Sequence, residues 1–135
     1  MHVLLDTNII GELGRLRPDA GVTAWAAQGA AQVAAHAISV VSVDEIMFGL
    51  AWRPNARIAA WFEAYLLRHP VLPVTLEIAR RAGELRGAFA ARGIARSQPD
   101  MLIAATAQVH ALTLVTRNTA DFAGCGIPVL NPFSA

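Results

Sequence analysis

Short apolar segments alternate along the chain with longer segments in which apolar residues recur every three or four positions. The first short segment, Val3–Leu5, is β-prone and carries no polar residue, which is typical of a strand buried on both faces of a parallel sheet. A second run, Ala37–Val43, is also predicted to be a buried strand. We expect three further strands, at Val71–Val74, where Pro73 indicates a sheet edge or a strand end, at Leu112–Thr116 and at Ile127–Leu130.

Helical patterns fill the intervals between these strands. The clearest one aligns a large apolar stripe that we expect to pack in the core, with a groove for a partner helix as the alternative. The stripe consists of Ile58, Trp61, Phe62, Tyr65 and Leu66, and Trp25 and Trp52 could extend it. We expect helices from Ile9, over Val22–Ala35, from Asp44 through Trp52, from Asn55, over Leu76–Ala91 with Thr75 as its cap, and over Met101–His110 and Asn118–Phe122.

The alternation of strands and helices predicts the fold class. No linker, repeat or low-complexity segment interrupts residues 1–135, so we expect a single domain. Alternating strands and helices favour an α/β fold of three layers, α/β/α, with a central parallel sheet of four to five strands. With 55% hydrophobic residues, a chain of this length can bury the core that such a domain needs.

The basic residues narrow the possible chemistry. All eleven are Arg, and the chain contains no Lys. Schiff-base chemistry and a P-loop lysine are therefore excluded. The single cysteine, Cys125, excludes an internal disulfide and a cysteine-based zinc cluster, and the four His are too scattered to suggest a histidine-rich metal site.

The location can also be predicted from the sequence. The apolar start of the chain is ended at once by Asp6, which is unlike a signal peptide. No apolar run approaches the roughly 18 residues that a membrane helix needs. We expect a cytoplasmic protein with no membrane segment.

Four of the ten acidic residues occupy positions that a parallel sheet would bring together. Asp6 directly follows the first predicted strand, Glu45 follows the second at a helix start, and Asp121 follows the fourth. Asp100 lies in the first turn of the helix before that fourth strand. Residues just past the carboxyl ends of parallel strands converge on one crevice. Clustered carboxylates repel one another, so Mg²⁺ or Mn²⁺ would neutralise them and could activate a water for attack on a phosphodiester.

Helix capping is the alternative explanation for three of these acids. Ser42–Glu45 and Ser97–Asp100 match a capping box, and Asn118–Asp121 has a similar form. Asp6 has less reason to be a cap, since it ends a buried apolar strand, and for Asp6 we favour a functional role. Spacing alone does not choose between Asp44 and Glu45 for the second position.

Five segments in order along nearly the whole chain resemble PIN-domain proteins. The resemblance is greatest to the VapC toxins of bacterial toxin–antitoxin pairs, including their FitB-like branch. The segments are Leu4–Ile10, Ser42–Leu50, Asp100–Ala107, Val115–Phe122 and Asn131–Phe133.

This resemblance implies a metal-dependent ribonuclease that uses Mg²⁺ or Mn²⁺ at a site of four acids. It favours Glu45 over Asp44, because the family's acid directly precedes the apolar run that ends in Gly49. The fourth acid stands either at the position of Asn118 or at that of Asp121, and we choose Asp121. The predicted metal-binding and catalytic residues are thus Asp6, Glu45, Asp100 and Asp121, supported by Asn8, Thr116 and Asn118, the last two through hydrogen bonds to a metal-bound water.

The same resemblance implies three partners: an RNA substrate, a cognate VapB-like antitoxin and a second copy of the chain in a homodimer. A net charge of +1 gives little long-range attraction for RNA, so a basic groove must be local or assembled by dimerisation. Candidate RNA contacts are Arg86, Arg92, Arg96 and Arg117. The rival functions are a nuclease on another nucleic acid and an inactive binding subunit, and the absence of a G-x-G-x-x-G motif disfavours a nucleotide-binding Rossmann domain.

Overall fold

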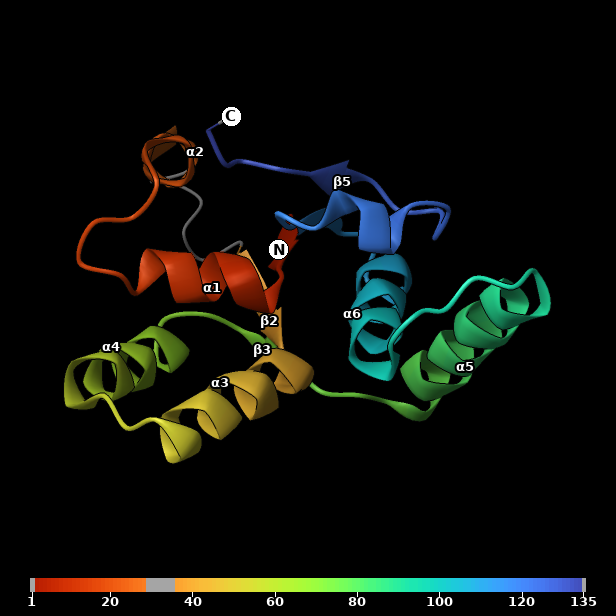
Figure 1. Ribbon diagram of the computed structural model, residues 1–135, viewed down its shortest axis with the longest axis horizontal. Helices are drawn as coiled ribbons and strands as arrows, with labels where there is room; N and C mark the ends of the chain where they lie inside the picture. The colour runs from red at the N-terminus through yellow and green to blue at the C-terminus, as the bar shows by residue number, and fades with distance from the viewer. Residues whose placement is uncertain (1, 29–35, 135) are drawn as a thin grey trace.

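A single parallel sheet organises the chain in the computed structural model, which describes residues 2–28 and 36–134 (Figure 1). Its strand order is β3-β2-β1-β4-β5, so the predicted α/β fold is confirmed with five strands. The elements are β1 Val3–Leu5, α1 Thr7–Leu13, α2 Ala20–Gln28, β2 His36–Ser39, α3 Val40–Trp52, α4 Ala56–Leu66, β3 Val71–Leu72, α5 Leu76–Ala91, α6 Gln98–Val109, β4 Thr113–Val115, the 3-10 helix η2 Thr119–Phe122 and β5 Val129–Leu130.

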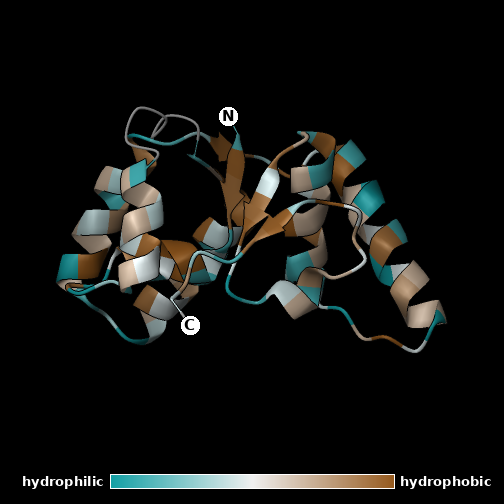
Figure 2. Cartoon of the chain, turned by 90° about the horizontal axis from the view of Figure 1, so that it is seen from above, coloured by the Kyte–Doolittle hydropathy of each residue, from teal (hydrophilic) through white to brown (hydrophobic). Residues whose placement is uncertain are grey.

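Helices cover both faces of the sheet, as the three-layer prediction requires. Neighbouring residues of one strand face opposite sides, so Leu4 and Leu5 belong to two different apolar clusters. Helices α5 and α6 pack on the face of Leu4, while α1 and α4 pack on the face of Leu5. The apolar strands lie between these two groups of helices in Figure 2.

Side-chain caps fix the starts of three helices. Asn55, Thr75 and Ser97 each accept a hydrogen bond from the backbone N–H three residues later, at 3.0, 3.2 and 3.2 Å. Each bond satisfies a donor that the first helical turn leaves without a partner. The predicted bounds of α5 are confirmed, and α6 begins three residues earlier than predicted.

The second strand is shorter than predicted. It ends at Ser39, whose side chain accepts a 3.0 Å hydrogen bond from the N–H of Val41, and α3 begins at Val40. The predicted strand Ala37–Val43 is therefore wrong from residue 40 on, because a serine cap outweighs the β propensity of the valines that follow. Glu45 consequently lies in the second turn of α3, and Ser42 is not its cap.

The amphipathic stripe of α4 is part of the core. Phe62 is fully buried and Tyr65 is 8% exposed, and both belong to the cluster around Leu5. The alternative use of the stripe as a partner groove is not supported. Pro73 follows the edge strand β3, as predicted. The expected helix Val22–Ala35 is seen as α2 up to Gln28, and its last seven positions, 29–35, lie outside the described residues.

None of the helices described here is long and apolar enough to cross a membrane.

Candidate active site

Asp6 lies at the carboxyl ends of the parallel strands, in the middle of the sheet. It ends β1, the middle strand, and only 5% of its surface is exposed. Thr116 follows β4, the neighbouring strand. From β1 the chain adds β2 and then β3 on one side of the sheet. It later adds β4 and β5 on the other side of β1, so the strand order reverses between β1 and β4. Open α/β sheets bind their ligands at such a switch point.

Three donors hold the Asp6 carboxylate in place. Its Oδ1 accepts a 2.8 Å hydrogen bond from the N–H of Thr7, while Oδ2 accepts bonds from Thr116 Oγ1 at 2.8 Å and Asn8 Nδ2 at 3.0 Å. The bond from Thr7 makes Asp6 the cap of α1, although we expected less reason for a cap at this residue than at the other three acids. The other two bonds come from residues predicted to support the site.

Thr116 connects the two sides of the topology switch. Its fully buried hydroxyl donates to Asp6 and accepts from Asn8 Nδ2 at 3.3 Å and from the N–H of Asn118 at 3.0 Å. All of its hydrogen-bonding capacity is therefore used within the protein. The exposed Asn118 side chain does not cap η2, which corrects the capping interpretation of Asn118–Asp121.

Glu45 contacts the hydrogen-bonded group around Asp6 through Thr7, a residue that was not predicted to belong to the site. The hydroxyl of Thr7 lies 2.7 Å from Glu45 Oε1 and 2.9 Å from Ser42 Oγ. Ser42 and Glu45 are three positions apart and therefore share a face of α3. This spacing is the one that was interpreted as a capping box. Asp44 is exposed and makes none of these contacts. The position of Thr7 directly after Asp6 is the sequence feature that could have identified it as a site residue.

Asp100 and Asp121 lie on the α6 side of the site. Asp100 is half-buried in the first turn of α6, where its N–H donates to Ser97 Oγ. Asp121 is exposed on η2. Arg96 joins the two elements, because its guanidinium donates to the backbone carbonyl of Asp121 and, at 2.8 Å, to that of Ala123. No pattern in the sequence predicts that Arg96 makes these two contacts.

The raised pKa values of Asp6 and Asp100 link these two acids to each other and to the charges of Glu45 and Asp121. Burial raises the pKa of Asp6, the charge of Glu45 raises it further, and the hydrogen bonds to Asp6 oppose both effects. Burial also raises the pKa of Asp100, helped by the charges of Asp6 and Asp121 and opposed by Ser97 and Arg96. Each acid is thus close enough to another for its charge to matter.

The chemistry of these donors fits a hard divalent cation. Within residues 2–28 and 36–134, no three Asp, Glu, His or Cys side chains form a ready-made metal-binding group. Four carboxylates in one electrostatic neighbourhood are nevertheless the oxygen donors that Mg²⁺ and Mn²⁺ neutralise. Asp6 already has a fixed orientation, whereas Glu45 and Asp121 are exposed and can turn toward a cation.

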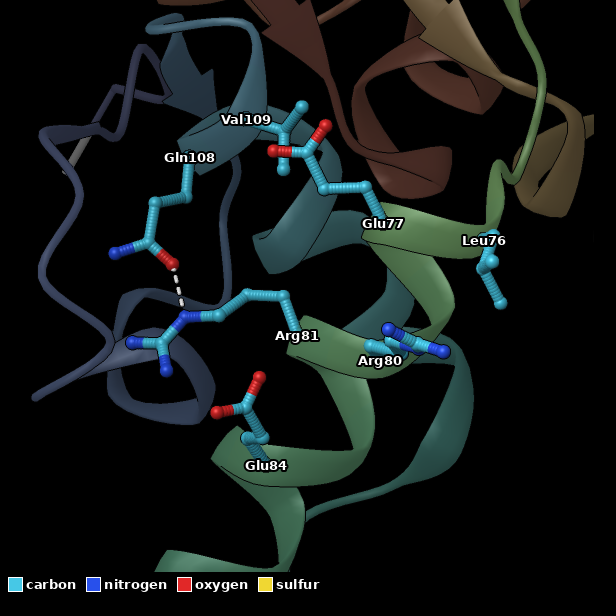
Figure 3. Close-up of a pocket in the computed structure, with 7 residues that line it drawn as sticks. All are labelled: Leu76, Glu77, Arg80, Arg81, Glu84, Gln108 and Val109. Carbon is cyan, nitrogen blue, oxygen red and sulfur yellow. Dashed lines mark hydrogen bonds between the residues drawn. The ribbon is translucent and has the colours of Figure 1, made fainter.

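A cavity of about 600 Å³ lies elsewhere, at the opposite end of α6 from Asp100 (Figure 3). Arg81 Nε donates to Gln108 Oε1 within it at 2.5 Å. None of the four acids belongs to its lining, so it is separate from the candidate active site. The cavity is lined by Leu76, Glu77, Arg80, Arg81, Glu84, Gln108 and Val109.

Known proteins resemble this chain over almost its entire length. It is 33% identical to a VapC ribonuclease of Sinorhizobium fredii, over 97% of each sequence. The crystal structure of FitAcB from Neisseria gonorrhoeae is similar with a TM-score of 0.85 at 30% identity, covering 96% of this chain and 97% of that one. A toxin–antitoxin complex from Klebsiella pneumoniae has a TM-score of 0.74 at 30% identity, covering 98% and 99%. The family model described as the PIN domain matches residues 3–124, and the chain belongs to the PIN-domain family.

Proposed function

We infer that this protein is the toxin of a toxin–antitoxin pair and acts as a metal-dependent endoribonuclease. The observation that carries this inference is the hydrogen-bonded Asp6 at the topology switch, with Glu45, Asp100 and Asp121 in its electrostatic neighbourhood. The relatives that are VapC ribonucleases and toxin–antitoxin proteins support the same function.

The four acids would share the work of hydrolysing an RNA phosphodiester. A bound Mg²⁺ or Mn²⁺ would lower the pKa of water and stabilise charge on the phosphate. Asp6 and Asp100 are the leading ligands, because both are at least half-buried and converge from two elements. Glu45 and Asp121 complete the donor set and orient the attacking water. Thr116 and Asn8 hold Asp6 in the orientation that this role needs.

We also propose a cognate antitoxin, a homodimer and a cytoplasmic location. Helix α3 offers a surface for a protein partner, because it exposes large apolar side chains beside the acids. Met47 is 44% exposed, and Phe48 and Trp52 are each 67% exposed. Apolar groups of this size at the surface are typical of interaction sites.

RNA cleavage by the purified, antitoxin-free chain tests the proposed activity. We expect it to cut single-stranded RNA with Mn²⁺ or Mg²⁺, to stop when EDTA is added, and to leave single-stranded DNA of the same sequence intact. Asp6→Asn should reduce the rate at least roughly 100-fold, while Asp44→Asn, an exposed neighbour of Glu45, should retain it.

Each alternative function gives a different result in the same assay. Equal cleavage of DNA would indicate a nuclease of broader substrate range. RNA binding without cleavage, unchanged by Asp6→Asn, would indicate an inactive binding subunit.

A further inference from the structure

The C-terminal residues Asn131–Ser134, here called the C-terminal strap, run from β5 to the N-terminus of α2 (Figure 1). Ser134 donates from both its N–H and its hydroxyl to the carboxylate of Asp19, at 2.9 and 2.5 Å. These bonds lower the pKa of Asp19 to about 2. The same carboxylate accepts from the N–H groups of Gly21 and Val22 at the start of α2. The strap is therefore fastened to α2.

Phe133 of the strap reaches toward the active site. Its half-buried ring packs against the apolar cluster that contains Leu5 and Ile9. The guanidinium carbon of Arg117 lies 4.6 Å from the centre of this ring. Arg117 directly follows Thr116, and its N–H donates to Asn8 Oδ1 at 3.1 Å. The backbone of Arg117 is thus bound to the Asp6 group, and its side chain is held by the strap.

The charge of Arg117 is not neutralised within the described part of the chain. The one ion pair recorded there joins Arg15 and Glu12, and the Arg117 guanidinium takes part in no hydrogen bond between described residues. Arg96 differs, because its guanidinium is committed to the carbonyls of Asp121 and Ala123. An arginine held over an aromatic ring, with no acceptor for its N–H groups, has them available for a two-oxygen acceptor such as a phosphate.

We propose that Arg117 binds a backbone phosphate of the RNA beside the acids, and that Phe133 and the C-terminal strap position it for this contact. A polyanion approaching four carboxylates needs a cation close by, and a net charge of +1 supplies little attraction from a distance. The proposal rests on the proposed ribonuclease function. It assigns the end of the chain a positioning role in substrate binding.

The test measures RNA binding without cleavage. Single-stranded RNA labelled with a fluorophore is titrated with Asp100→Asn protein in EDTA at several salt concentrations, and anisotropy gives the Kd. In this background, Arg117→Ala should weaken binding about tenfold and reduce the slope of log Kd against log salt by about 0.7. Phe133→Leu should weaken binding about two- to fivefold, the range expected for an exposed cation–π contact, whereas Phe133→Trp should keep it.

A double-mutant cycle separates positioning from a general effect on the fold. Phe133→Leu should have no further effect once Arg117 is Ala, because Phe133 acts through Arg117. Arg80→Ala, on α5 in the distant cavity, is the matched control and should bind normally. Equal losses from Phe133→Leu with and without Arg117 would overturn the positioning role, and an unchanged Kd and salt slope for Arg117→Ala would overturn the phosphate contact.

Failure of this inference can be distinguished from failure of the ribonuclease proposal. If the unmodified chain neither cleaves nor binds RNA, the ribonuclease proposal fails. If it cleaves RNA and Arg117→Ala binds as tightly as its parent, only the inference about Arg117 and the strap fails. Circular dichroism melts of every variant check that each protein is folded.

Discussion

The hydroxyl of Thr116 donates a 2.8 Å hydrogen bond to Oδ2 of Asp6 across 110 positions of sequence. The bond joins the ends of β1 and β4, the two strands between which the sheet topology switches. It orients one carboxylate oxygen and opposes the rise in the pKa of Asp6 that burial causes. Thr116 is therefore the supporting residue whose removal should affect Asp6 most directly.

Thr116→Val removes this hydroxyl with little change in shape. Oδ2 of Asp6 would lose a donor and the N–H of Asn118 would lose its acceptor, so the free energy of unfolding should fall by about 1–3 kcal/mol. A less firmly oriented Asp6 should also bind Mn²⁺ about 10–100-fold more weakly, as measured by calorimetric titration.

Thr106→Val is the matched control, because the hydroxyl of that buried threonine donates to Leu102 O within α6 and contacts none of the acids. It should lower stability without changing Mn²⁺ affinity. Equal Mn²⁺ affinities for the two variants would contradict the role given to Thr116.

Asp100→Asn tests through stability how burial and the neighbouring acids act on the Asp100 carboxylate. A carboxyl group whose pKa is raised on folding favours the protonated form in the native state, so its ionisation destabilises the fold as pH rises above the ordinary value of 3.8. Replacing Asp100 by a neutral amide removes this penalty. In EDTA the variant should melt a few degrees above its parent at pH 7, and the gain should shrink as the pH falls toward 4.

Asp44→Asn provides the comparison in the same thermal melts, since Asp44 is exposed and lies outside the hydrogen-bonded group. Its melting temperature should follow that of the parent at every pH. A gain for Asp100→Asn that does not depend on pH would show that charge is not its cause.

The sequence was sufficient to predict the elements that local chemistry determines. Thr75 and Ser97 are caps in the positions predicted, and Asn55 caps a helix that was expected to start there, because a side-chain oxygen three residues before a free N–H is a short-range feature. Ser39 was missed as a cap because the valines after it have strong β propensity, which its hydrogen bond from the Val41 N–H outweighs.

The candidate site also divides into features that the sequence predicts and features that depend on packing. Positions just past the predicted strands suggested the acids, whereas the choice of Glu45 over Asp44 and the supporting roles of Asn8 and Thr116 came from the resemblance to PIN-domain proteins. The contact of Thr7 with Glu45 joins α1 to α3, and that of Arg96 with the Asp121 carbonyl joins the loop before α6 to η2. Such contacts depend on how elements pack together, for which a single sequence has no periodic signal.

Gly21→Ala should loosen the C-terminal strap. A Cβ at this position would stand 2.5 Å from both Pro132 O and Ser134 N, and neither backbone atom can move without displacing the strap. We expect a loss of about 1–3 kcal/mol in the free energy of unfolding, measured by urea denaturation. Gly87→Ala on α5 meets nothing within 4 Å and should instead stabilise the protein by about 0.5–1 kcal/mol. A neutral Gly21→Ala would contradict the close packing of strap and helix.

Tyr65→Phe should stabilise the protein, although Tyr65 lies in the core. Its hydroxyl is buried without a hydrogen-bond partner among the described residues, and burial raises its pKa. Removing the oxygen should raise the free energy of unfolding by about 1 kcal/mol in urea denaturation at pH 7. The ring itself stacks on His69 at 3.9 Å and contacts Trp61 at 5.2 Å, so Tyr65→Leu should cost about 1–3 kcal/mol. A loss of stability in Tyr65→Phe would mean that the hydroxyl has a partner in solution.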